Sequence, residues 1–287
     1  MTRVLPDAVQ GKLFVSDLDG TLLRPDRTLG QRSRRVLQRL IDDGGLFTVA
    51  TGRGIGSTAE VLRGLHLPLG AILHNGALTA RLDSGAIARI DPLAEDAAGV
   101  LFARALALDL TPTAYALPRG SADATQTMVF HGPRPNRPTL AYLDSVRPHH
   151  ACDVDHGAGL REMQVLSLIV LDHPQRIDEL FSGCVDLELT LCSGASAYTP
   201  GLGVGEITGR TASKRTAAAA LAASLGLDLG RVVAFGDNAN DLPLLLAAGQ
   251  AFCPTDAPER VQRQIAGRIP APRDEGVAAY FEQLMPG

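Results

Sequence analysis

The amino-terminal part of the chain alternates between short apolar runs and longer amphipathic stretches. The apolar runs are 12–18, 46–50 and 71–74. They lack polar alternation, which is typical of strands buried on both faces of a parallel sheet. Between them, apolar positions recur at helical spacing over 30–43, and a capping box at Ser57 and Glu60 predicts the start of another helix. This β-α-β-α-β order predicts a parallel sheet flanked by helices.

The pattern changes beyond residue 81. Two short strand-like stretches flank the turn Asp83-Ser84-Gly85, and a mixture of helices and strands follows, including an apolar strand over 165–171. Such a mixture interrupts the alternation of strands and helices and favours a separate α+β insert. We expect this insert to span 82–194.

The alternating pattern then returns. A helix is predicted over 211–225 with Lys214 in its first turn, and strands are predicted over 231–235 and 250–253. We therefore expect an α/β fold in which 1–81 and 195–287 together build one core domain.

Composition narrows the class of protein. At 287 residues the chain can form two domains, and 45% apolar and 20% charged residues are typical of a globular protein. The net charge of −4 provides no broad basic field, so we expect no nucleic-acid or membrane partner. No apolar run is long enough for a membrane span, the start lacks a secretory pattern, and the four cysteines show no CxxC spacing. We therefore expect a cytoplasmic protein with reduced thiols.

Two carboxylates follow the first apolar run. Asp17 and Asp19 stand two positions apart at the end of a strand, so both can face one site. Gly20 permits a sharp turn, and Thr21 adds a hydroxyl group beside the acids. Like charges this close should keep one carboxyl partly protonated unless a cation binds there. The arrangement favours chemistry over packing.

Polar clusters also follow two other predicted strands. Thr51-Gly52-Arg53 ends the second strand, and Asp237-Asn238 with Asn240 and Asp241 ends the strand over 231–235. Ligands of parallel α/β sheets bind at the carboxyl ends of the strands, where these clusters would meet. Carboxylates without a partnering His or Cys favour an oxygen-seeking cation such as Mg²⁺. Lys214, Thr51 and turn N–H groups favour a phosphate beside that ion.

These residues resemble the four motifs of the haloacid dehalogenase superfamily. The motifs are VSDLDGTLL at 15–23, TGR at 51–53, Lys214, and GDNANDLPLL at 236–245. The order and spacing, with Asn75-Gly76-Ala77 after the third strand and Asp274 to Val277 before the last helix, resemble the Cof-type phosphatases of subclass IIB. The resemblance implies a Rossmann-like core with an inserted α+β cap of the C2B type. It covers about 12–81 and 195–285, and no motif from the insert carries it.

The resemblance also implies a role for each motif residue. Asp17 would be the nucleophile that forms an aspartyl-phosphate, and Asp19 the general acid and then the base. Thr51 and Lys214 would hold the transferring phosphoryl oxygens. The implied Mg²⁺ ligands are Asp17, Asp19 through its carbonyl, Asp237 and Asp241. The implied substrate-binding residues are Gly52, Arg53, Asn75, Gly76 and Asn240.

Each residue also has a purely structural alternative. The Asp17/Asp19 pair could form only a turn, Thr51 could cap the next turn, and Lys214 could be a solvated residue at a helix start. Asp241 could be a helix N-cap, and Arg53 and Asn75 could fix loops. The histidines His149, His150 and His156 lack metal-ligand spacing, so a solvated loop is expected.

The predicted function is Mg²⁺-dependent hydrolysis of a small phosphorylated metabolite by a monomer or homodimer. Related proteins act on sugar phosphates and on phosphorylated cofactors such as pyridoxal phosphate or flavin mononucleotide. A phosphosugar mutase and a non-catalytic phosphate sensor remain alternatives on the same scaffold. One departure from the family is the loop Cys253-Pro254-Thr255-Asp256-Ala257 in place of a small-residue turn, where Asp256 is expected to cap the next helix.

Overall fold

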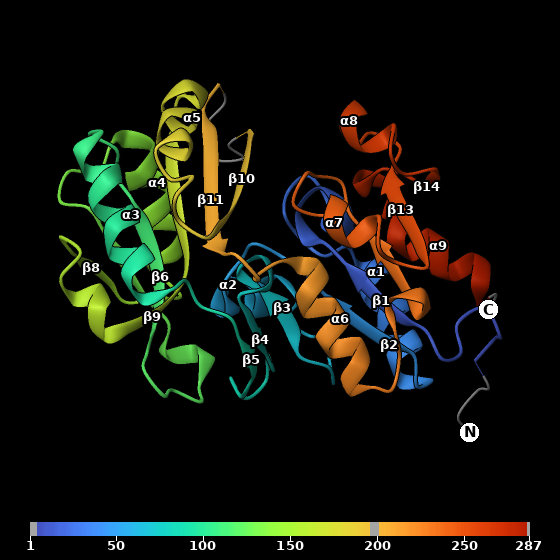
Figure 1. The fold of residues 1–287 in the computed structure, drawn as a ribbon. Coiled ribbons are helices and arrows are strands. Elements are labelled where there is room, and N and C mark those ends of the chain that lie inside the picture. Colours follow the sequence, from blue (N-terminus) through green and yellow to red (C-terminus); the bar gives the residue numbers. More distant parts are fainter. Residues whose placement is uncertain (1–4, 196–200, 286–287) are drawn as a thin grey trace. The chain divides into compact units, whose positions relative to one another are not determined.

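The computed structural model describes residues 5–195 and 201–285, and Figure 1 shows their helices and strands. The chain forms two compact units. The first contains 1–54, 58–83 and 213–287, and the second contains 55–57 and 84–212. None of the helices in the described ranges is both long and apolar enough to cross a membrane.

The first unit is built on a five-stranded parallel sheet. Its strand order is β14-β13-β12-β1-β2. The strands are β1 (Leu13–Ser16), β2 (Leu46–Val49), β12 (Val232–Phe235), β13 (Gln250–Pro254) and β14 (Gly267–Ile269). β1 lies between β12 and β2, and Ser16 is level with Phe235 on one side and Val49 on the other. The chain therefore leaves three adjacent strands at the same height.

Helices cover both faces of this sheet. The helices of this unit are α1 (Gln31–Asp42), α6 (Lys214–Ser224), α7 (Leu242–Leu245), α8 (Glu259–Gln262) and α9 (Gly276–Leu284), whereas α2 (Ile55–Val61) begins with residues of the second unit. Leu13 and Val15 of β1 join a core with the alanines of α6, whereas the Phe14 ring packs edge-on against Phe281 of α9. Because neighbouring residues of a strand point to opposite faces, the buried run LFVS supplies both cores. The parallel, helix-flanked core predicted from the sequence is confirmed.

Two local predictions for the first unit need correction. The run at 71–74 shares only an isolated parallel bridge, Ala50 to Ile72, with the main sheet. As β3 (Ala71–Leu73) it pairs antiparallel with β4 (Leu78–Ala80), because the chain reverses sharply between them. α2 begins at Ile55 after an extended Gly54, so Ser57 lies inside the helix and forms no capping box.

The second unit is an α+β domain with its own sheet. The strand order is β10-β11-β9-β6-β7-β8, antiparallel except for the pair β7 and β8. Its strands are β5 (Ile87–Ile90), which lies outside this sheet, β6 (Thr113–Pro118), β7 (Met128–His131), β8 (Cys152–Val154), β9 (Met163–Asp172), β10 (Leu189–Ala195) and β11 (Gly203–Gly209). Its helices are α3 (Glu95–Ala107), α4 (Arg137–Val146) and α5 (Pro174–Ser182). The expected inserted α+β fold is thus present.

The second boundary of the insert differs from the expected position at 195. β11 pairs with β9 along most of its length, and the chain returns to the first unit only at Ser213. Gly203 and Gly205 obscured this strand in the sequence, since glycine is unfavourable in strands. Both glycines are packed closely, because a Cβ on Gly205 would lie 2.8 Å from the Ile177 side chain of α5.

Candidate active site

The candidate site lies at the carboxyl ends of β1, β2 and β12, all within the first unit. Backbone hydrogen bonds continue past each strand: Asp17 N–H donates to the Phe235 carbonyl, and Ala50 N–H donates to that of Ser16, both at 2.9 Å. The segments that carry Asp17, Thr51 and Asp237 are therefore held next to one another. This is the edge at which the sequence predicted a site.

Lys214 is the cation of the site. It is the first residue of α6, where Ser213 caps the helix and forms a capping box with Thr216. Its side chain is 1% exposed, and Nζ donates to Asp17 Oδ1 and Asp241 Oδ1, both at 2.6 Å. The solvated-residue alternative is therefore wrong. Sequence reasoning missed Ser213, although the spacing Ser-x-x-Thr before an alanine-rich helix was an available signal.

Asp237 and Asp241 complete the polar group. Thr21 Oγ1 donates to Asp237 Oδ1 at 2.9 Å, and Asp241 Oδ2 accepts from the N–H groups of Asp237 and Asn238 at 3.0 and 2.9 Å. Asp241 occupies the N-cap position of α7, but its side chain makes no capping hydrogen bond there. Its carboxylate instead fixes the loop after β12 and pairs with Lys214.

Gly20 allows the close approach between the first and last motifs. Its φ is +79°, in the left-handed region that favours glycine, and a Cβ there would lie 2.5 Å from an Asp237 carboxylate oxygen. The turn after Asp19 therefore needs glycine both for its backbone conformation and for space. The sequence predicted a Thr21 hydroxyl beside Asp17 and Asp19, and the acid to which it donates is Asp237.

The electrostatics of the site indicate uncompensated negative charge. Burial raises the pKa of Asp17 well above its ordinary value of 3.8; Lys214 opposes this rise, and Asp241 and Asp237 add to it. Burial and the neighbouring Asp241 raise the pKa of Asp237 to about 7. Burial alone would lower the pKa of Lys214, but the attraction of Asp17 and Asp241 outweighs it and raises that pKa.

The donor set fits a divalent cation. Asp17, Asp237 and Asp241 each offer a carboxylate oxygen, and these oxygens lie within 4.8 Å of one another. They outnumber the one ammonium, which contacts two of them, and oxygen ligands are those preferred by Mg²⁺. A bound dication would offset the repulsion between these carboxylates, which adds to the effect of burial on the pKa values of Asp17 and Asp237. The Asp19 side chain points elsewhere, so its own contribution to a metal would have to come from its carbonyl.

Asp19 is held by Arg53. The guanidinium donates from Nε to Oδ2 and from Nη2 to Oδ1, both at 2.6 Å. Thr51 is 1% exposed, and its Oγ1 accepts from Arg53 N–H at 3.2 Å, so it does cap the turn that contains Gly52. The loop-fixing alternative for Thr51 is thus observed, and a role toward phosphate stays a prediction.

Asn75 and Asn240 tie two loops together. Asn240 Nδ2 donates to Asn75 Oδ1 at 3.0 Å, and Asn75 N–H donates to the Thr51 carbonyl at 2.9 Å. His74, Asn75 and Gly76 all have positive φ, and a Cβ on Gly76 would lie 2.1 Å from the Ser213 carbonyl oxygen. The segment after β3 thus packs against the start of the helix that carries Lys214. Loop fixing is observed, and substrate binding by these residues stays a prediction.

Two expectations outside this group are wrong. His150 is not in a solvated loop but is buried, with Nδ1 hydrogen-bonded to the Thr127 carbonyl and its ring edge-on to Tyr115. Asp256 does not cap α8, whose N-cap is Pro258 and has no side-chain hydrogen bond. Instead, Asp256 Oδ2 lies 3.9 Å from Arg273 Nη1.

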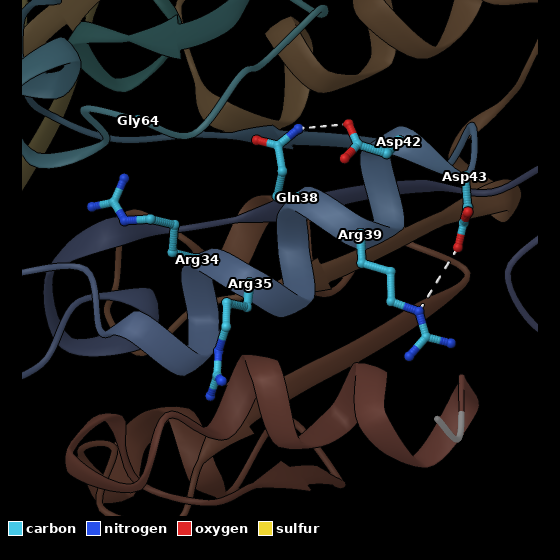
Figure 2. Close-up of a pocket in the computed structure, with 7 residues that line it drawn as sticks. All are labelled: Arg34, Arg35, Gln38, Arg39, Asp42, Asp43 and Gly64. Carbon is cyan, nitrogen blue, oxygen red and sulfur yellow. Dashed lines mark hydrogen bonds and ion pairs between the residues drawn. The ribbon is translucent and has the colours of Figure 1, made fainter.

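An open hollow of about 530 Å³ lies elsewhere in the first unit, along α1 (Figure 2). Apart from Gly64 its lining residues carry polar or charged groups, and two pairs of them are in contact: Gln38 donates to Asp42, and Arg39 Nε lies 3.9 Å from an Asp43 carboxylate oxygen. None of the motif residues lines it. The hollow is therefore separate from the candidate active site at the sheet edge.

The family model for haloacid dehalogenase-like hydrolases matches residues 14–281. The chain belongs to this family. The Bacillus subtilis 5-amino-6-(5-phospho-D-ribitylamino)uracil phosphatase YwtE is 24% identical over 96% of this chain and 99% of its own. The HMP-PP phosphatase of Klebsiella pneumoniae is 27% identical over 88% of each chain. A solved structure of a subclass IIB sugar phosphatase superposes with a TM-score of 0.76 at 16% identity, over 95% of this chain and 98% of that one.

The predicted superfamily, subclass and enzyme class are thereby confirmed. This haloacid dehalogenase-like hydrolase is a phosphatase of the Cof type, with a parallel-sheet core and an inserted cap. Membership of the family implies a divalent metal, and the three clustered carboxylates are the group that fits it.

Proposed function

We propose that this phosphatase hydrolyses a small phosphomonoester through an aspartyl-phosphate on Asp17, with Mg²⁺ as its cation. The observation that carries the proposal is the buried contact of Lys214 with both Asp17 and Asp241, beside a third carboxylate. A nucleophilic carboxylate next to a fixed ammonium is suited to attack a phosphoryl group whose oxygens need neutralising.

In the first half of the reaction, an Asp17 oxygen attacks phosphorus while the bond to the leaving oxygen breaks. Asp19 gives its proton to that oxygen, so the alcohol leaves neutral. In the second half, Asp19 takes a proton from water, whose oxygen bonds to phosphorus as the bond to Asp17 breaks. Phosphate is released, and both aspartates return to their starting states.

Lys214 and Thr51 act on the phosphoryl group without exchanging protons in this scheme. The ammonium and the buried hydroxyl would bind its oxygens and hold phosphorus in line with Asp17. Mg²⁺, held by Asp17, Asp237, Asp241 and the Asp19 carbonyl, would supply charge neutralisation for the transferring phosphoryl group. Gly52, Asn75, Gly76 and Asn240 would shape the loops around it.

The substrate class rests on the relatives. Their names give a phosphoribityl-uracil, HMP-PP and a sugar phosphate as compounds on which those proteins act. We infer a small phosphorylated metabolite for this chain, with a sugar phosphate as the first choice and a phosphorylated cofactor as the second. We further infer that the enzyme works in the cytoplasm as a monomer or homodimer.

The test is phosphate release from 4-nitrophenyl phosphate and from a panel of phosphorylated metabolites. Activity should require Mg²⁺, and Asp17→Asn should abolish it, whereas Asp42→Asn on the surface of α1 should not. Full activity of Asp17→Asn, or in excess chelator, would refute the mechanism. Conversion of a sugar phosphate to its isomer without free phosphate would instead identify a mutase.

A further inference from the structure

Asp19, the proposed general acid, forms an ion pair with Arg53. Both Asp19 oxygens are engaged by two nitrogens of one planar guanidinium, at 2.6 Å each. The side chain of Asp19 is 45% exposed, whereas that of Arg53 is only 17% exposed. The arginine is therefore the better anchored partner, and the carboxylate is the group whose direction it sets.

The backbone of Arg53 is fixed on both sides. Its N–H donates to Thr51 Oγ1 at 3.2 Å, and its carbonyl accepts from His74 N–H at 3.1 Å. Asp19, by contrast, lies in an irregular turn, with extended backbone angles followed by Gly20 at φ +79°. The loop after β2 thus holds the Arg53 guanidinium, whose two donating nitrogens form a fork. The Asp19 carboxylate, on the more irregular turn, aligns with this fork.

A general acid must present one carboxyl oxygen to the leaving group. A guanidinium has five donors and no acceptor, so it cannot accept a bond from a protonated oxygen. When Asp19 carries the proton, its O–H must therefore point away from the guanidinium, while the unprotonated oxygen keeps its hydrogen bond to Arg53. The fork would then act as a pivot that restricts the carboxyl to rotation about one held oxygen.

We propose that Arg53 is a positioning residue that acts through Asp19 and orients its carboxyl group toward the leaving oxygen, and that it does not serve mainly to bind the substrate phosphate. This inference rests on the proposed role of Asp19. It assigns Arg53 a function different from the substrate contact predicted from the sequence.

The test compares two leaving groups. The glycerol oxygen of glycerol 2-phosphate is a poor leaving group that needs a proton from a general acid. 4-Nitrophenolate leaves readily without protonation. Arg53→Ala should lower kcat/KM for glycerol 2-phosphate about 10- to 100-fold, because a misoriented catalytic group typically costs rates of this order. The loss for 4-nitrophenyl phosphate should stay below about threefold, since proton donation contributes little there.

Two further variants separate geometry from charge. Arg53→Lys keeps the positive charge but loses the fork, so it should resemble Arg53→Ala with glycerol 2-phosphate and leave inhibition by inorganic phosphate unchanged. Arg32→Ala is the matched control, because Arg32 forms the same Nε and Nη2 fork with Glu282 in the same unit, and neither residue belongs to the group formed by Asp17, Lys214, Asp237 and Asp241. For each of the two substrates, the kcat/KM of Arg32→Ala should equal that of the parent.

The Asp19→Asn background decides between the two roles. If Arg53 acts through Asp19, adding Arg53→Ala to Asp19→Asn should not slow the single-turnover transfer of phosphate to Asp17 any further. An equal loss for both substrates, additivity with Asp19→Asn, or weakened phosphate inhibition would overturn the inference in favour of direct substrate binding. The proposed function would survive that result, since it fails only if Asp17→Asn or removal of Mg²⁺ leaves activity intact.

Discussion

Replacing Lys214 with methionine removes the buried ammonium and keeps an unbranched side chain. The ammonium contacts two carboxylates at 2.6 Å and is 1% exposed. Without it, Asp17, Asp237 and Asp241 lack their protein counter-charge. The metal-free variant should therefore lose stability as well as activity.

The size of the stability loss follows from these contacts. At an effective dielectric constant of about 20, each 2.6 Å pair is worth about 6 kcal/mol of Coulomb attraction. Dehydration of the charges offsets much of this, and breaking a buried pair typically costs about 3–5 kcal/mol. For a unit of this size such a loss lowers Tm by roughly 6–20 °C. Protonation of Asp17, whose pKa is raised by burial, should reduce the cost at low pH.

Calorimetry of the metal-free protein at pH 8, with and without added Mg²⁺, measures the effect. Mg²⁺ should raise the Tm of Lys214→Met more than that of the parent, because a dication replaces the missing charge. Lys12 is the only other lysine of the chain, so Lys12→Met is the matched control and should change Tm little. Equal Tm values for Lys214→Met and the parent in chelator would refute the view that this ammonium neutralises the site.

Three further outcomes are expected. Because the pKa of Asp237 is raised to about 7 from an ordinary value of 3.8, the folded state retains a proton that the unfolded chain has lost. The metal-free protein should thus lose stability between about pH 4 and pH 7, and calorimetric titration at pH 7 should detect proton release on Mg²⁺ binding; Asp237→Asn should weaken both effects, leaving the share that comes from Asp17. Gly76→Ala should cost more stability in denaturant titration, and more activity, than Gly44→Ala: both positions have positive φ, but only the Cβ at Gly76 would meet backbone, 2.1 Å from Ser213 O. Thr21→Val should weaken Mg²⁺ affinity without unfolding the protein, because it removes the 2.9 Å hydrogen bond that orients Asp237; an unchanged affinity would contradict this reading.

The core fold and the motif residues could be predicted from the sequence because local sequence patterns determine both. A buried strand that ends in two acids predicts where Asp17 and Asp19 lie, and parallel strands bring their carboxyl ends to one edge. The burial of Lys214 was not readable in this way. It depends on carboxylates that approach from β1 and from the loop after β12, which are distant in the chain.

The misplaced elements have physical reasons as well. β11 was missed because its glycines are residues that usually interrupt strands. In the structure these glycines leave space for the Ile177 and Phe181 side chains of α5. β3 was expected in the parallel sheet because the sharp reversal after it was not recognised. The reversal begins with a positive φ at His74, and the residue type of His74 does not predict that conformation. The fork between Arg53 and Asp19 also escaped prediction, since the pairing joins two loops that only the folded sheet brings together.

Trapping the covalent intermediate tests the central claim most directly. The Asp19→Asn variant should retain transfer to Asp17 from 4-nitrophenyl phosphate but lack the base that activates water. Acid quenching and peptide mass analysis after Mg²⁺ addition should therefore find phosphate on Asp17, in an amount that approaches one per chain. Phosphate release without any modified Asp17, or the same labelling in Asp17→Asn, would contradict the account.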